Sequence, residues 1–249
     1  MRVFYCLHFL KIKMSCNSRL FLQYVKVGYY QELQVDIMQK NAALIVVDVQ
    51  NGFTSGGNLA VAHAEQIIPL INQLIEKFEN VILTQDWHPK NHISFAENHA
   101  NKKAYDFVQA DYGTQVLWPT HCVQGTVDAD FHPDLNTTTA QLILRKGINP
   151  QIDSYSAFME ADHKTTTGLA GYLKERKIDT VYIVGIATDF CVAWSAMDAA
   201  KLGFETYVIS DATKAIDLQG TLQHAWQEML AVGVKRVVAK QILNTEKSI

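Results

Sequence analysis

The chain has 249 residues, of which 48% are hydrophobic and 19% charged, and its formal net charge is −3 at pH 7. This composition predicts a globular protein with a full core, and the scattered lysines and arginines exclude the basic stripe of a nucleic-acid-binding protein. The four cysteines (Cys6, Cys16, Cys122 and Cys191) lie far apart, without the spacing of a metal ribbon or a disulfide framework, so the sequence predicts a reducing, cytoplasmic setting.

Residues 1–37 differ in character from the rest of the chain. The apolar run at residues 3–10 is followed by Lys11 and Lys13, is too short for a membrane span, and precedes no signal-peptide cleavage site. Met38 instead leads directly into the first strongly apolar segment. We therefore predict that residues 1–37 are a disordered extension or a start-site artefact, and that residues 38–249 form one domain without a membrane partner.

From residue 41 onward, short apolar runs alternate with longer amphipathic segments. The pattern predicts strands at residues 42–48, 81–85, 141–146, 181–186, 206–210 and 236–239, and helices at residues 58–78, 163–176, 191–203 and 222–232. Apolar strands that alternate with helices are typical of an α/β protein whose parallel sheet is covered on both faces. Residues 88–136 are too many for a passive connection, so we expect a functional loop there.

Polar side chains stand at the carboxyl ends of the predicted strands, where sheets of this kind bind their ligands. Asp48 ends the first strand, Lys146 ends the third, and Cys191 begins the helix after the fourth. We interpret them as an acid, a cation and a nucleophile that converge, with Lys146 and the helix N-terminus both favouring the thiolate. The alternatives are a turn cap for Asp48, a solvated ammonium for Lys146 and a buried, inert thiol for Cys191.

A second group of polar residues has the pattern of a metal site. Asp86 and His88 lie two residues apart, on the same side of an extended segment, and His121 follows in the long loop. Two histidines and one carboxylate suit Zn, Fe or Mn, and the sequence does not choose among these metals. His92 and His132 are further candidates of lower rank, and His92 could instead support the ligands from outside.

Six blocks in a fixed order carry a resemblance to a known family. They read DVQNGF (48–53), DWHP (86–89), WPTHC (118–122), RKG (145–147), DSYSAF (153–158) and GIATDFC (185–191). Together they resemble the nicotinamidases, a group of isochorismatase-like cysteine hydrolases, from residue 42 to the C-terminus. The resemblance implies a three-layer αβα, Rossmann-like fold with a six-stranded parallel sheet. It also implies hydrolysis of nicotinamide to nicotinate and ammonia in NAD salvage, with pyrazinamide as an alternative substrate.

The resemblance also implies a role for individual residues. Asp48, Lys146 and Cys191 match the catalytic triad, and the Ile186–Ala187 bond matches a cis peptide. Our mechanistic hypothesis adds an oxyanion hole made of the backbone N–H groups of Ala187 and Cys191. The ligands of one divalent metal ion match Asp86, His88 and His121, with His92 matching an extra ligand of some relatives. The aromatic positions around the pyridine ring match Phe53, Trp118 and Tyr155, and we expect Cys122 only to pack.

Two other functions stay open on the sequence alone. A carbamoyl or ureido amidohydrolase of the same fold would share the acid, the lysine and the cysteine, but such enzymes generally lack the metal set of Asp86, His88 and His121. A non-catalytic metal-binding or interaction protein on the same scaffold is the other alternative. A dinucleotide-dependent dehydrogenase is excluded because no GxGxxG follows the first strand. The sequence is compatible with either a monomer or a homo-oligomer.

Overall fold

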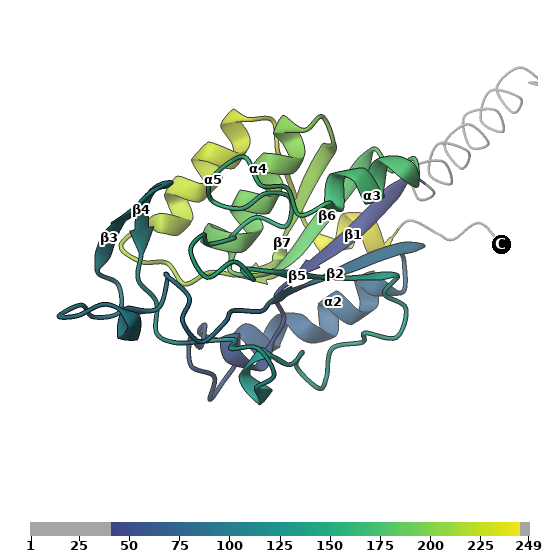
Figure 1. Cartoon of the computed structure of the whole chain (residues 1–249). Helices are drawn as coiled ribbons and strands as arrows, with labels where there is room; N and C mark the ends of the chain where they lie inside the picture. The colour runs from purple at the N-terminus through teal and green to yellow at the C-terminus, as the bar shows by residue number, and fades with distance from the viewer. Residues whose placement is uncertain (1–40, 245–249) are drawn as a thin grey trace, which may run out of the picture.

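The computed structural model describes residues 41–244, so the prediction for residues 1–37 lies outside the described part of the chain. Its centre is a six-stranded sheet in the order β5-β2-β1-β6-β7-β8, with every neighbouring pair parallel (Figure 1). All six predicted strands are present, and the α/β fold with a six-stranded parallel sheet is confirmed. They are β1 (Ala42–Val47), β2 (Asn80–Asp86), β5 (Leu142–Lys146), β6 (Thr180–Ile186), β7 (Glu205–Lys214) and β8 (Lys235–Val237).

Helices cover both faces of this sheet. Figure 1 shows α2 (Ile68–Ile75) on one face, and α3 (Leu169–Glu175), α4 (Ala193–Lys201) and α5 (Thr221–Ala231) on the other. Successive side chains of a strand point to opposite faces, so β1 contributes to the apolar core on both sides of the sheet. Leu44 packs in the core cluster that includes α2, and Ile45 packs in the core cluster that includes α3 and α4. A short helix, α6 (Ala239–Leu243), joins the α2 side.

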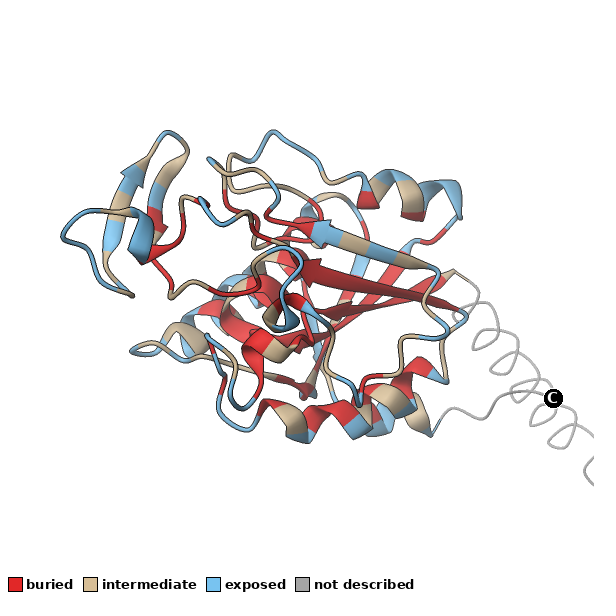
Figure 2. Cartoon of the chain, turned by 60° about the horizontal axis from the view of Figure 1, so that its bottom comes forward, coloured by how far each residue is buried: buried red, intermediate tan, exposed pale blue. Residues whose placement is uncertain are grey.

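The central strands are buried along their whole length, as the red ribbon of Figure 2 shows. Their registers decide which strand ends meet. Asp86, the last residue of β2, pairs with Lys146, the last residue of β5, and Val47 of β1 pairs with Gly185 of β6. The carboxyl ends of these four strands therefore lie side by side, at the edge where the sequence predicted the site.

Two predicted helices are shorter than expected, because left-handed residues delay their start. The helix predicted at 58–78 begins as a 3-10 turn, η2 (Ala64–Ile67), after His63 at φ 59°, and continues as α2. The helix predicted at 163–176 begins only at Leu169, after Gly168 at φ 90°. No residue from 41 to 244 belongs to a helix long and apolar enough to cross a membrane.

The long segment from 88 to 136 contains structure that the sequence did not predict. A hairpin of β3 (Phe107–Ala110) and β4 (Gly113–Val116) stands apart from the main sheet (Figure 1). Its strands are half exposed and lack a clear apolar alternation, which is why the pattern gave no strand signal there. Short 3-10 turns mark the surrounding loops: η1 (Asn51–Phe53), η3 (Ala96–Asn98) and η4 (Val127–Ala129).

Candidate active site

The acid, the lysine and the cysteine predicted to converge do lie together. Asp48 directly follows β1, Lys146 ends β5, and Cys191 lies in the turn after β6. The Lys146 Nζ atom is 2.8 Å from Asp48 Oδ2 and donates a hydrogen bond of 3.3 Å to Cys191 Sγ. Lys146 also donates to Asp86, which links this strand-end trio to the second predicted group.

Burial controls the protonation of the strand-end trio. Burial raises the pKa of Cys191 well above its ordinary value. Lys146 acts to lower this pKa, as predicted, but its effect is smaller than the combined effect of burial and the nearby carboxylates. The expected lowering of the thiol pKa is therefore wrong for this arrangement. Burial also raises the pKa of Asp48, against the opposing effect of Lys146. Burial alone would lower the pKa of Lys146, yet Asp48 and Asp86 hold it well above its usual range.

The sequence predicted that Cys191 lies in the first turn of an α-helix, and this prediction is wrong. The turn that carries Cys191 is a π turn, η5 (Thr188–Val192), and α4 begins after it at Ala193. The turn is entered through a cis Ile186–Ala187 bond, which agrees with the resemblance. Gly185 has φ 112°, and a Cβ there would overlap the Val47 backbone, so only glycine allows β6 to approach β1 at this point.

The two predicted histidines face the Asp86 carboxylate. His88 Nε2 and His121 Nε2 lie 3.5 Å and 3.7 Å from Asp86 Oδ2, and all three residues are buried. The other ring nitrogen of each histidine lies against a backbone carbonyl: His88 Nδ1 is 2.9 Å from Gly147 O and His121 Nδ1 is 2.8 Å from Pro119 O. A histidine that donates through Nδ1 presents the Nε2 lone pair, so these three residues fit one metal ion.

The charges of this second group favour an ionised carboxylate. Burial acts to raise the pKa of Asp86, but Lys146 and His88 hold this pKa well below its usual range. Burial would lower the pKa of His88, but Asp86 raises it overall. An anionic oxygen with two imidazole nitrogens is the donor set expected for Zn, Fe or Mn. We call Asp86, His88 and His121 the histidine cluster.

The two lower-ranked histidines lie outside the group of Asp86, His88 and His121, but His92 is close to it. His92 stacks near His88, with ring centroids 4.2 Å apart, and its Nδ1 is held by Ser94 Oγ at 2.7 Å. His92 forms, with His88 and Asp153, a second buried set of possible metal donors whose atoms lie within 4.8 Å of one another. Burial lowers the pKa of His92 to about 4. His132 lies beside Asp134, in the loop after η4.

Cys122 is buried and packs against the backbone of Asp128, as expected for a structural thiol.

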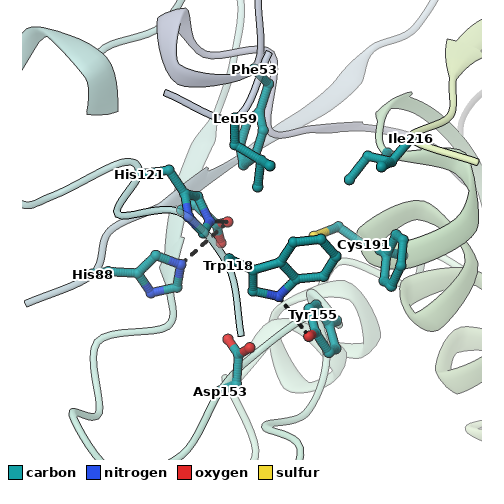
Figure 3. A pocket seen from close by; sticks show the side chains of 12 residues that line it. Phe53, Leu59, His88, Trp118, His121, Asp153, Tyr155, Cys191 and Ile216 are labelled. Carbon is teal, nitrogen blue, oxygen red and sulfur yellow. Dashed lines mark hydrogen bonds and ion pairs between the residues drawn. The ribbon is translucent and has the colours of Figure 1, made fainter. Parts of the chain in front are cut away.

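A pocket opens between Cys191, the member of the strand-end trio that lines it, and the histidine cluster (Figure 3). It holds about 350 Å³ of empty space, counting its open mouth. The predicted aromatic residues Phe53, Trp118 and Tyr155 all line it, and Trp118 Nε1 donates to the Tyr155 hydroxyl at 2.9 Å. Ala187 and Cys191, the predicted oxyanion-hole residues, line it as well. An aromatic slot with a thiol on one side and metal ligands on the other suits a flat heteroaromatic amide.

Four further lining residues had no predicted role: Leu59, Asp153, Phe190 and Ile216. Asp153 and Phe190 belong to blocks that carried the resemblance, so their presence near the site could have been inferred from chain position. Leu59 and Ile216 are aliphatic residues in loops, and nothing in their local sequence distinguishes a pocket wall from ordinary packing.

Comparison with known proteins gives concordant matches. Residues 42–240 match the family model described as the isochorismatase domain. The chain is 70% identical over 203 residues to a nicotinamidase of Acinetobacter baylyi, a match that covers 82% of this chain and 95% of that protein. It is 68% identical to a solved nicotinamidase and pyrazinamidase of Acinetobacter baumanii, with a TM-score of 0.81 over 82% of this chain and 98% of that one. A pyrazinamidase of Pyrococcus horikoshii, solved in complex with zinc, is 39% identical, with a TM-score of 0.66 over 80% of this chain and 99% of that one.

Proposed function

Because the chain belongs to the isochorismatase domain family, we propose that it is a nicotinamidase, which converts nicotinamide and water to nicotinate and ammonia. One observation carries this proposal: a single aromatic pocket is lined both by Cys191, which contacts a buried Lys146–Asp48 pair through Lys146, and by a two-histidine, one-carboxylate cluster. The trio supplies the groups that break an amide bond, and the cluster supplies a means to recognise a ring nitrogen. Such a reaction returns nicotinamide to NAD salvage, and pyrazinamide, which has the same carboxamide on a diazine ring, is the expected second substrate.

The Cys191 sulfur attacks the amide carbon. Since burial raises the pKa of this thiol, its proton leaves during the attack, and Asp48 is the base that receives it. The bond between sulfur and carbon forms as the carbonyl π bond becomes an oxyanion, which the backbone N–H groups of Ala187 and Cys191 stabilise. Asp48 then gives the proton to the departing ammonia.

Water completes the cycle by hydrolysing the thioester. Asp48 accepts a proton from the water, whose oxygen adds to the carbonyl carbon to give a second oxyanion. As the carbonyl re-forms, the bond between carbon and sulfur breaks, and Asp48 returns its proton to the sulfur, which leaves as a thiol. Lys146 keeps its charge throughout, because two carboxylates raise its pKa. Its Nζ atom contacts both Asp48 Oδ2, at 2.8 Å, and Cys191 Sγ, at 3.3 Å, and so positions the acid and the thiol relative to each other. Its ammonium also balances the negative charge that develops on the sulfur.

We propose that Asp86, His88 and His121 hold one divalent ion, Zn, Fe or Mn. When bound, that ion supplies a Lewis acid for the ring nitrogen of the substrate, which fixes the carboxamide toward Cys191. We also propose the cytoplasm as the compartment, since Cys191 must stay a free thiol, which a reducing compartment preserves.

The test measures ammonia and nicotinate released from nicotinamide by the purified protein, as isolated, after chelation, and after addition of Zn, Fe or Mn. We expect release from nicotinamide and pyrazinamide that falls on chelation and returns with one metal. An N-carbamoyl amide, the substrate class of the related amidohydrolases, serves as the control. Hydrolysis of the carbamoyl compound without hydrolysis of nicotinamide by folded, metal-loaded protein would contradict the proposal.

A further inference from the structure

We propose that Asp189 is a positioning residue, which fixes the loop of residues 215–220 so that Ile216 forms a wall of the substrate pocket beside Cys191. The inference rests on the proposed function, because the wall matters only if the pocket holds the ring of an amide. Asp189 lies two residues before Cys191, inside the π turn η5. It belongs to the block GIATDFC, yet it has no part in the mechanism above.

The Asp189 carboxylate accepts three hydrogen bonds from a distant segment, residues 216–221. Its Oδ1 accepts from the Ile216 N–H at 3.1 Å, and its Oδ2 accepts from the Asp217 N–H at 2.8 Å and from the Thr221 hydroxyl at 2.6 Å. The side chain is buried, and within the described residues no lysine or arginine pairs with it. Two donors from the loop and one from the first residue of α5 thus replace the water that this carboxylate loses on folding.

The segment that Asp189 binds has a backbone that needs such an anchor. Asp217 and Gln219 have φ of 54° and 53°, in the left-handed region that side chains other than glycine rarely adopt, and Gly220 has φ 94°. Strained loops persist only where surrounding contacts fix them. The segment also leads into α5 at Thr221, and a carboxylate near a helix N-terminus is favoured by the helix dipole.

The consequence for the pocket follows from Ile216. Its N–H is held by Asp189, and its side chain points into the pocket near Cys191, as Figure 3 shows. Cys191 and Ile216 are therefore fixed to each other through one carboxylate, although they lie 25 positions apart in the chain. If the loop were released, the wall would move away from the ring while the sulfur stayed in the turn η5. We expect weaker substrate binding with a smaller effect on the chemical step.

The experiment is a double-mutant cycle on the full chain with Asp189→Asn and Ile216→Ala. An amide keeps the shape of the carboxylate but turns one acceptor into a donor that faces an N–H. We expect each single change to raise KM for nicotinamide about tenfold and to lower kcat less than about threefold. In the double variant the two effects should not add, because a released loop has already withdrawn Ile216.

A milder pair keeps the test informative if Asp189→Asn does not fold. Thr221→Val removes one of the three hydrogen bonds, and Thr221→Ser retains it as the matched control. The valine variant should raise KM and speed hydrogen exchange of the Ile216 and Asp217 amides about tenfold, and the serine variant should restore both. Unchanged exchange and KM in the valine variant would overturn the proposal, as would additive effects in the cycle. A wild-type protein that releases no ammonia from nicotinamide would contradict the proposed function instead, and the exchange rates would still decide whether Asp189 holds the loop.

Discussion

The two sides of the pocket are built in different ways. Asp48 directly follows β1 and Lys146 ends β5, so the registers of β1, β2 and β5 set their separation, and Cys191 lies in the short turn η5 after β6, which pairs with β1. In the histidine cluster, Asp86 ends β2, but the two histidines depend on loop backbone, because the carbonyls of Gly147 and Pro119 orient the rings of His88 and His121. In the function that we propose, the strand-end trio breaks the amide bond, and the histidine cluster orients the substrate. Damage to the first side should abolish bond breaking, and damage to the second should weaken metal and substrate binding.

The largest effect is expected from removing the nucleophile. Cys191→Ala should lower turnover at least about 10⁴-fold, because Cys191 is the only thiol of residues 41–244 that lines the pocket. Metal content, measured by elemental analysis, should stay at the wild-type level, since the histidine cluster is untouched. Cys122→Ala is the matched control: it removes the other described thiol and should retain turnover. A Cys191→Ala protein that still hydrolyses nicotinamide would contradict the assignment of bond breaking to the strand-end trio.

The next largest effect is expected at the base. Asp48→Asn should lower kcat/KM at least about 10³-fold, because the amide cannot take the thiol proton. In the wild type, burial raises the pKa of Asp48, and the base works only when ionised. The rate should therefore fall with decreasing pH through a value above the ordinary range of aspartate. A pH profile of kcat/KM without this acid limb would exclude Asp48 as the base.

A smaller change should affect the loop side alone. Gly147 has φ 66°, and a Cβ there would overlap the His88 imidazole, so Gly147→Ala should displace that ring. We expect metal affinity to fall at least about tenfold, as measured by competition with a chelator. Gly171→Ala is the matched control, because it lies in α3 with open space around it. It should leave metal affinity unchanged and raise stability by up to about 1 kcal/mol. Equal metal affinity in both variants would contradict the role of the Gly147 carbonyl.

The smallest effect is expected at the aromatic wall between the two sides. Tyr155→Phe removes the hydroxyl that accepts from Trp118 Nε1 at 2.9 Å and from Gln115 Nε2 at 3.0 Å. The Trp118 ring then loses its partner and its fixed orientation, and we expect KM to rise about threefold with little change in kcat. A loss confined to kcat, at unchanged KM, would assign the hydroxyl to the chemical step instead.

The same contrast explains what the sequence could predict. The strand-end trio was predictable because β-branched runs locate strands, and parallel topology brings their ends together. The strand and helix pattern also predicted the fold, whereas the histidine cluster was predicted from the spacing of Asp86 and His88, from a histidine in the long loop, and from the resemblance. The effect of burial on Cys191 was not predictable, since desolvation depends on neighbours from the whole chain. Ile216 and the β3–β4 hairpin were missed because aliphatic and half-exposed segments carry no local signal of their contacts.

The most direct test of the account asks whether Cys191 carries the acyl group. Wild-type protein would be mixed with nicotinamide, quenched in acid during turnover and mapped by mass spectrometry. The account predicts a nicotinoyl thioester on the peptide that contains Cys191, present in Cys122→Ala and absent in Cys191→Ala. Nicotinate formed by the wild type with no adduct on Cys191, or with the adduct on another residue, would contradict it.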